Sequence, residues 1–345
     1  MNPKGCSFLE DGINFDLDTV CDCCIMHNDG RGLPVLLENY HGELIDWENL
    51  FKIKAKRIEA QKQATIYDCE GCYRLADYNF TGEEKISELH FSHCRACNAK
   101  CIYCSEEYSG GFLNYDTYPV IKDLIEKGYH KGGGEATMEG GEPTLMQSFD
   151  ELVHLLTSNG TNIRVHTSGI KFSPTVAEAL TNRQGKIVIS PDSSCSETFK
   201  KIKQVDAFEK VCENIKKYSH AANGNTSDII IKYILVPGYN DNIKEIKNFF
   251  KLLNKLGIST VALDIEVKYA MKYNNKDVSP HIYFLVDYFE NLAKKYNMQL
   301  LKYSFLSYVL NNRTIEKAKY LNNDILFNFR IKKFIQKEKN INYTR

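Results

Sequence analysis

Four cysteines lie within eleven residues, in the stretch CRACNAKCIYC at positions 94 to 104. Taken together, Cys94, Cys97, Cys101 and Cys104 could close the coordination of a zinc ion or an iron–sulfur cluster. Taken without Cys94, the stretch supplies three thiolates to a [4Fe–4S] cluster and leaves the fourth iron open to a small ligand. Cys94 falls at the end of a predicted strand, so we expect its side chain to point away from the loop.

A second group of cysteines precedes this stretch. Ten of the twelve cysteines come before residue 105. The chain has 345 residues and begins without a basic-then-apolar signal segment, so clustered thiols in a reducing cytosol are more typical of metal ligands than of a disulfide framework. We predict an auxiliary metal site from Cys6, the CxxC pair Cys69 and Cys72, and one of three closely spaced thiols. These three are Cys21, Cys23 and Cys24, of which Cys24 is taken as the ligand.

Composition limits the function classes. Lys plus Arg and Asp plus Glu both number 44, and this balance argues against bulk nucleic-acid binding. Hydrophobic residues make up 43% of the chain, yet no window approaches the run of about eighteen apolar residues that spans a bilayer. We therefore expect a cytoplasmic protein with no transmembrane segment and no nucleic-acid partner.

From residue 86 the chain alternates between predicted strands and helices. Six strands alternating with helices predict an α/β fold with a parallel, helix-covered sheet, curled into a partial (β/α)6 TIM-like barrel with an N-terminal Cys-rich extension. The predicted strands are 86–94, 135–143, 162–169, 186–194, 228–238 and 259–267. The predicted helices are 118–129, 148–160, 174–180, 206–220, 242–257 and 281–295, with one more near 47–63. The predicted domains are a Cys-rich module at 1–85, the barrel at 86–270, and a helical region with a basic tail at 271–345.

Barrels of this kind carry their chemistry at the carboxyl ends of the strands. The polar segments of the sequence fall at those ends. They are the cysteine stretch after the first strand, then GGEP, HTSG, SPDSS, VPGYND and DIEV after the next five.

The sequence resembles the radical SAM superfamily at two independent places. CNAKCIYC matches the CxxxCxΦC motif, with Tyr103 as the aromatic residue, and the motif's cysteines are Cys97, Cys101 and Cys104. The GGE-type turn of the family is matched by Gly140, Gly141, Glu142 and Pro143, where glycines let the backbone approach the amino group of S-adenosylmethionine (SAM). The resemblance covers about residues 86 to 270.

The resemblance implies a reaction and further contacts. A reduced [4Fe–4S] cluster would cleave SAM to methionine and a 5′-deoxyadenosyl radical, which takes a hydrogen atom from the substrate. An external electron donor would supply the electron. The family pattern implies that several residues at strand ends bind SAM. They are Thr167, Ser168, Ser190, Asp192 and Lys232.

The N-terminal cysteines resemble, more loosely, SPASM/twitch auxiliary-cluster modules. Such a module normally follows the barrel, whereas here the cysteines precede it. The resemblance favours a second [4Fe–4S] cluster over a structural zinc ion. It also favours a peptide as the unknown substrate, with a small metabolite next. Cys195 at the barrel mouth is either a hydrogen donor to a substrate radical or, as we prefer, a small residue of a turn.

Two other functions stay open. The chain could activate a partner protein by forming a glycyl radical, or it could be a non-enzymatic zinc or iron–sulfur protein with a closed four-cysteine site. The basic stretch after Asn312 could dock on a membrane surface or an acidic partner, but a helix covering the barrel is the preferred interpretation.

Overall fold

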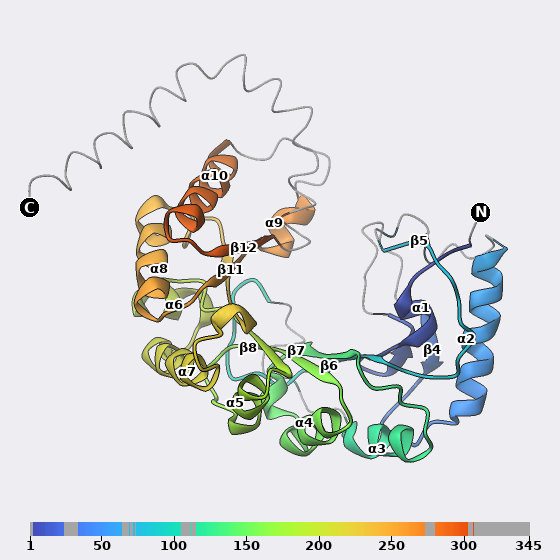
Figure 1. Cartoon of the computed structure of the whole chain (residues 1–345). Helices are drawn as coiled ribbons and strands as arrows, with labels where there is room; N and C mark the ends of the chain where they lie inside the picture. Colours follow the sequence, from blue (N-terminus) through green and yellow to red (C-terminus); the bar gives the residue numbers. More distant parts are fainter. Residues whose placement is uncertain are drawn as a thin grey trace, which may run out of the picture.

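A computed structural model describes residues 3–23, 34–63, 69, 72, 74–104, 111, 115–272, 280–302 and 306. Ten strands form one sheet in the order β12-β11-β10-β9-β8-β7-β6-β2-β3-β4. The sheet bends into an open arc, with α3, α4, α5, α7 and α8 along its outer side (Figure 1). These elements form the partial TIM-like barrel that the sequence predicts.

Seven consecutive strands of the arc pair in parallel. They are β6 (Glu88–Cys94), β7 (Glu135–Gly140), β8 (Asn162–Thr167), β9 (Gly185–Ile189), β10 (Ile229–Leu235), β11 (Thr260–Ile265) and β12 (Gln299–Lys302). The first six are the predicted strands. The four-residue β12 is a seventh that the sequence analysis did not predict.

Helices connect these strands, most of them along the outer side of the arc (Figure 1). They are α3 (Tyr118–Glu126), α4 (Phe149–Ser158), α5 (Pro174–Thr181), α6 (Ser196–Lys203), α7 (Phe208–Ala221), α8 (Ile243–Lys255), α9 (Val267–Lys272) and α10 (Pro280–Lys295), with single 3-10 turns η2 (Pro143–Leu145) and η3 (Thr226–Asp228). The predicted helices are confirmed to within a few residues, and α6 and α9 are additions. Ser148 precedes α4 but does not cap it, because its backbone is left-handed (φ 51°) and its hydroxyl donates to Asp116 instead.

The N-terminal region extends the same sheet. Here β2 (Gly12–Phe15) pairs in parallel with β6, and β3 (Thr19–Cys21) and β4 (Val35–Glu38) follow as antiparallel strands. The long helix α2 (Trp47–Lys62) is fixed to them by Lys54, whose buried ammonium contacts Asp22 at 2.7 Å and the Gly12 carbonyl at 2.8 Å. The short elements are α1 (Ser7–Asp11) and the pair β1 (Lys4–Gly5) and β5 (Ala76–Asp77). Of the N-terminal cysteines, Cys21 therefore lies on a continuation of the barrel sheet.

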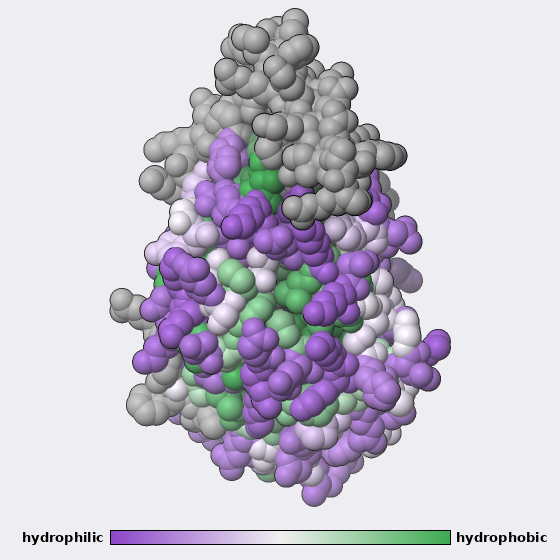
Figure 2. Space-filling view, turned by 90° about the vertical axis from the view of Figure 1, so that its left-hand side faces the viewer, coloured by the Kyte–Doolittle hydropathy of each residue, from purple (hydrophilic) through white to green (hydrophobic). Residues whose placement is uncertain are grey.

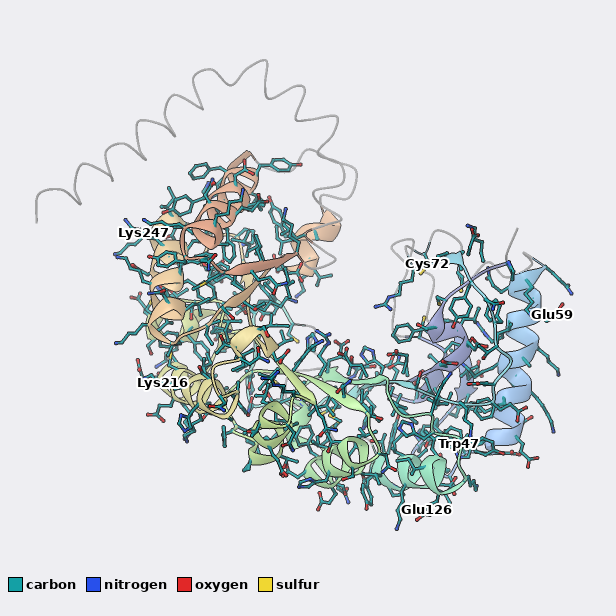
Figure 3. All side chains as sticks on the ribbon, in the orientation of Figure 1. Trp47, Glu59, Cys72, Glu126, Lys216 and Lys247 are labelled. Carbon is teal, nitrogen blue, oxygen red and sulfur yellow. The ribbon has the colours of Figure 1, made fainter. Side chains whose placement is uncertain are left out.

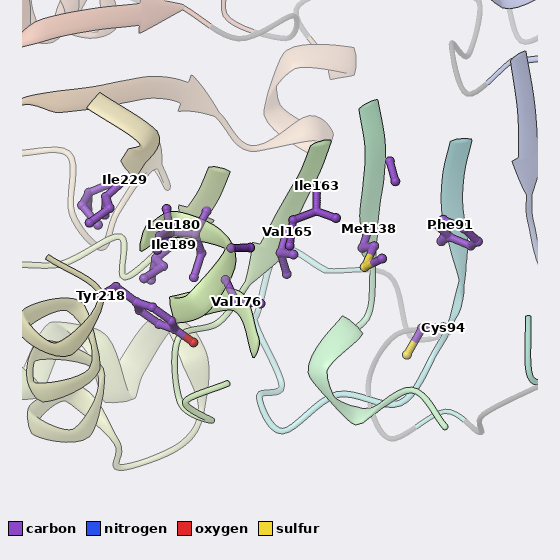
Figure 4. Close-up of a cluster of buried hydrophobic side chains, with 14 of the residues drawn as sticks. Phe91, Cys94, Met138, Ile163, Val165, Val176, Leu180, Ile189, Tyr218 and Ile229 are labelled. Atoms are coloured by element: carbon purple, nitrogen blue, oxygen red, sulfur yellow. The ribbon is translucent and has the colours of Figure 1, made fainter. Parts of the chain in front are cut away.

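The two faces of the arc differ in chemistry. Side chains that point toward the helices form the large apolar core, part of which is drawn in Figure 4, including Phe91, Met138 and Val165. Among the described residues, the opposite, inner face carries a small apolar cluster of Val188, Ile230 and Ala262. The face seen in Figure 2 is mainly hydrophilic at its edges, with hydrophobic residues near its middle. No helix in the described part of the chain has the length and apolar character needed to cross a membrane.

The buried His93 makes stability dependent on pH. Its ring stacks on Tyr115 with centroids 4.6 Å apart, and burial, with Arg95 nearby, lowers its pKa to about 4. An unfolded histidine has a pKa of about 6.5, so between pH 6.5 and 4 the unfolded chain binds more protons and stability falls as the pH falls.

We expect His93 to contribute about 2 kcal/mol to the loss of unfolding free energy between pH 7 and pH 5. Urea unfolding at both pH values measures this loss, and a His93→Phe variant should lose less than the wild type by that amount. His154→Phe, at an exposed position, is the matched control and should behave as the wild type does. Equal pH dependence in His93→Phe and the wild type would contradict the prediction.

Candidate active site

The cysteine loop begins where β6 ends, and its first cysteine turns away from it. Cys94 is fully buried in the core (Figure 4), and its thiol donates to the carbonyl oxygens of Ala96 and Glu142 at 3.5 Å each. Burial raises the pKa of this thiol to about 11. Cys94 therefore packs as part of the core, as the sequence analysis expects.

The next three cysteines lie in the loop itself, half-buried. The pKa of the Cys97 thiol is raised to about 11, mainly by burial. The nearby Cys101 and Cys104 also raise it. A thiol with so high a pKa becomes a thiolate near neutral pH only when a metal cation displaces its proton.

Three neighbouring loop thiols form a donor set that suits an iron–sulfur cluster. In a [4Fe–4S] cluster each thiolate binds a different iron, so the sulfurs lie at separate corners and need not converge. Cys97, Cys101 and Cys104 are therefore the residues that suit such a cluster.

The GGEP turn packs directly on this loop. The Gly141 N–H donates to the Cys94 carbonyl and the Glu142 N–H to the Ala96 carbonyl, both at 2.7 Å. A Cβ atom at Gly141 would lie 2.3 Å from the Ala96 oxygen, and one at Gly140 would lie 2.7 Å from the Cys94 oxygen. Gly140 also has φ +104°, which side-chain-bearing residues rarely adopt. The glycines are needed so that the turn can approach the cysteine loop.

Glu142 is fully buried and ties the end of β8 to the turn that follows β7. Its carboxylate accepts the hydroxyls of Thr144 and Thr167 at 2.7 Å, and both the N–H and the hydroxyl of Ser168 at 2.8 and 2.7 Å. The Ser168 hydroxyl also lies 2.8 Å from Oδ1 of Asn98 in the cysteine loop. Pro143 follows, buried at the start of η2. The predicted residues of the second and third strand ends are thus brought together, with Glu142 directed into the protein.

Asp192 is also buried, at the end of β9, and is the centre of a triad of polar side chains. Its Oδ2 accepts the Tyr103 hydroxyl at 2.6 Å and pairs with the Lys203 ammonium at 2.6 Å. Burial alone would lower the pKa of Lys203, but Asp192 and its neighbours raise it, so this lysine is cationic. The sequence analysis did not identify Lys203, because it lies on an unpredicted helix. Ser190 lies half-buried just before this group.

A row of ionisable side chains crosses the inner face of the arc, below the loops. Lys232 on β10 pairs with Asp264 on β11 at 2.9 Å, and His90 on β6 lies 3.0 Å from Glu139 on β7. Burial lowers the pKa of His166 on β8 to about 4. Burial alone would raise the pKa of Glu139. The His90 imidazole beside it, together with the nearby His166 and Lys232, instead lowers this pKa to about 2. Figure 3 shows polar side chains along this concave side.

The remaining predicted residues are separate from this group. Cys195 is exposed and starts α6, with its thiol 3.4 Å from the Thr198 hydroxyl. Cys6 lies at the start of α1, where Cys72 is close enough to affect its pKa, and the Cys72 N–H donates to the Cys69 carbonyl at 3.1 Å. Cys24 lies outside the described residues, whereas Cys21 is buried, and Cys23 half-buried, in the β2–β4 region. The auxiliary metal site stays a prediction.

The comparisons with known proteins agree with the loop chemistry. The family model for the radical SAM superfamily matches residues 91–253. A probable GTP 3′,8-cyclase of Saccharolobus solfataricus is 28% identical over 183 residues, covering 52% of this chain and 56% of that protein. One from Sulfurisphaera tokodaii is 24% identical, covering 70% and 75%. The chain spans about half the length of the Saccharolobus relatives it matches.

Two solved structures are distantly similar. Streptococcus suis SuiB bound to S-adenosylmethionine gives a TM-score of 0.48 at 14% identity, covering 81% of this chain and 58% of that chain. Native anSMEcpe with bound AdoMet and the Cp18Cys peptide gives 0.44 at 15% identity, covering 61% and 62%. Likeness at this level does not extend to activity or substrate.

Proposed function

Because residues 91–253 make this chain a member of the radical SAM superfamily, we propose that Cys97, Cys101 and Cys104 hold its [4Fe–4S] cluster and that its substrate lies on the inner face of the barrel. The chain is a radical SAM enzyme, and the cofactors of the superfamily are a [4Fe–4S] cluster and SAM. The observation that carries the proposal is the separation of one buried thiol, Cys94, from three half-buried loop thiols.

The chemistry of the cofactors is simple to state. When bound, the reduced cluster supplies one electron that cleaves SAM to methionine and a 5′-deoxyadenosyl radical, which then takes a hydrogen atom from the substrate. The protein must hold the reacting carbon near that radical and exclude other hydrogen donors. Ser168 and Ser190, half-buried at strand ends around the loop, are the side chains we propose for contacts to SAM. Thr167 is buried and donates its hydroxyl to Glu142, so we propose that it supports the turn instead.

Two predicted SAM ligands have other partners here. The carboxylates of Glu142 and Asp192 are buried and hydrogen-bonded within the protein. We propose that they act on the cofactor indirectly, by fixing the turn and the loop. Lys232, which sequence analysis also assigned to SAM, pairs with Asp264 on the inner face and is proposed as part of the substrate surface.

The inner face favours a polar substrate. The row of His90, Glu139, His166, Lys232 and Asp264 offers both charges and little apolar surface. Relatives named as probable GTP 3′,8-cyclases suggest a nucleotide, so GTP is the first small molecule to test. A peptide is the second class of substrate, because its amino and carboxylate groups carry both charges, as the row on the inner face does.

The test is anaerobic. The protein is reconstituted with iron and sulfide, reduced with dithionite, and given SAM alone, with GTP, or with a set of short peptides. We expect 5′-deoxyadenosine in every case and an increase with the true substrate, together with a change in that substrate's mass. A Lys232→Met variant should keep the substrate-independent product and lose the increase. A well-loaded cluster that releases no 5′-deoxyadenosine would contradict the proposal.

A further inference from the structure

The buried triad of Tyr103, Asp192 and Lys203 has a use beyond holding the loop. All three pairs are joined: Lys203 Nζ lies 2.6 Å from both the Tyr103 oxygen and Asp192 Oδ2, and the Tyr103 hydroxyl donates to Asp192 at 2.6 Å. Asp192 and Lys203 are both less than 4% exposed. The second oxygen of Asp192 accepts the Ile234 N–H at 2.8 Å, which fixes the carboxylate against β10.

The triad is built into the cysteine loop. The Lys100 N–H donates to the Lys203 carbonyl and the Ile102 N–H donates to the Ile202 carbonyl, both at 3.0 Å, so the loop runs along the end of α6. These bonds place Cys101, the residue between the two donors, beside Lys203. The Cys101 thiol lies near enough to the Lys203 ammonium and the Tyr103 hydroxyl to raise the pKa of both groups.

Stability alone does not explain a buried ion pair of this kind. Burying an ammonium and a carboxylate costs several kcal/mol of lost hydration, and a pair of apolar residues often stabilises a protein as well. A loop can be held by backbone bonds alone, and this one already has two. The charged pair therefore has an effect that apolar packing would not have. Its position beside Cys101, a proposed ligand, indicates that this effect is on the cluster.

We propose that Lys203 and Asp192 set the reduction potential of the cluster that Cys101 helps to hold. This proposal rests on the proposed function, since it takes Cys101 as a ligand. Reduction adds one negative charge to the cluster, and hydrogen bonds to the sulfurs and nearby charges decide how favourable that is. The ammonium lies beside Cys101 and would stabilise the reduced form, whereas the carboxylate behind it would oppose part of this effect.

The opposite charges of the two residues give predictions of opposite sign. Lys203→Met removes the cation and should make reduction about tenfold less favourable, which is a fall of about 59 mV for one electron. Asp192→Asn removes the opposing anion and should raise the potential. The double variant should fall between the two single variants. Lys203→Arg keeps the charge and should stay near the wild-type potential.

The measurement is a redox titration of the reconstituted protein followed by the electron paramagnetic resonance signal of the reduced cluster, without SAM. Iron and sulfide content confirms equal loading. Lys201→Met, on the exposed side of the same helix and paired with Glu197, is the matched control and should leave the potential unchanged. If Lys203→Met does not load iron, Asp192→Asn and Lys203→Arg still test the proposal.

Two failures can be told apart. A cluster present in all variants, with potentials that do not move or that move in the same direction for Lys203→Met and Asp192→Asn, overturns the role of the pair and leaves the proposed function intact. A wild-type protein that binds no [4Fe–4S] cluster, or binds it without need of Cys101, overturns the proposed function instead.

Discussion

Substituting Cys97 with alanine is expected to reduce SAM cleavage to background, while Cys94→Ala is expected to retain it. The two thiols are only three residues apart, but Cys97 lies in the loop with Cys101 and Cys104, and Cys94 is enclosed in the core. Losing one of three thiolates leaves an iron without its ligand. Losing the Cys94 sulfur leaves a small cavity, at a cost of about 1 kcal/mol.

The measurement is release of 5′-deoxyadenosine from reduced, reconstituted protein, normalised to iron content. Cys101→Ala and Cys104→Ala should behave as Cys97→Ala does. Cys212→Ala, at a buried cysteine on α7, provides a packing control. Equal loss of iron in the Cys94 and Cys97 variants would identify a closed four-cysteine site and contradict the three-cysteine assignment.

The sequence predicts the barrel well because each strand carries a local signal. Runs such as IIIKYIL in β10 and KIVI in β9 are rich in β-branched residues and are bounded by turns, and amphipathic helices separate them. The strand β12, with the sequence QLLK, has only four residues, so no local pattern marks it. The strand β2 is as short, and its partner β6 lies about 75 residues later in the chain.

The site could be predicted only in part, because local sequence patterns do not reveal contacts between residues that are far apart in the chain. Motif spacing identifies Cys97, Cys101 and Cys104 because the loop that holds them is continuous in sequence. Lys203 could not be found this way, since it meets Tyr103 across 100 residues and meets Asp192 through the fold. The inner-face row has a weak signal: polar residues alternate with apolar ones on β6, β7 and β8, whereas fully buried parallel strands are more uniformly apolar.

The second large effect is expected when Glu142 is substituted. The free energy of unfolding should fall, and activity should fall only as a consequence. The Glu142→Ala variant removes the fully buried acceptor of four donors. They are the hydroxyls of Thr144 and Thr167 and the N–H and hydroxyl of Ser168. Hydroxyls can rotate toward other acceptors, but the Ser168 N–H cannot. An unsatisfied buried donor costs about 1–3 kcal/mol, so the total should reach ~3 kcal/mol or more.

Glu142→Gln separates stability from cofactor contact. It keeps the shape and one acceptor oxygen but presents an NH2 group to donors, so its cost should be smaller, about 1–2 kcal/mol. Urea unfolding of the protein without cluster or SAM measures both changes. Glu178→Gln, at an exposed position on α5, is the matched control, and its substitution should cost less than about 1 kcal/mol.

The outcome decides what this glutamate does. If Glu142→Gln is destabilised as expected and SAM affinity falls only in proportion to the fraction folded, the carboxylate acts by holding the GGEP turn, the end of β8 and the cysteine loop in one arrangement. If Glu142→Gln is as stable as the wild type yet binds SAM much more weakly, Glu142 instead touches the cofactor, and its buried network must open to let it do so. The buried network favours the first result, because moving the carboxylate outward would break its bonds from Thr144 and Thr167 and both of its bonds from Ser168.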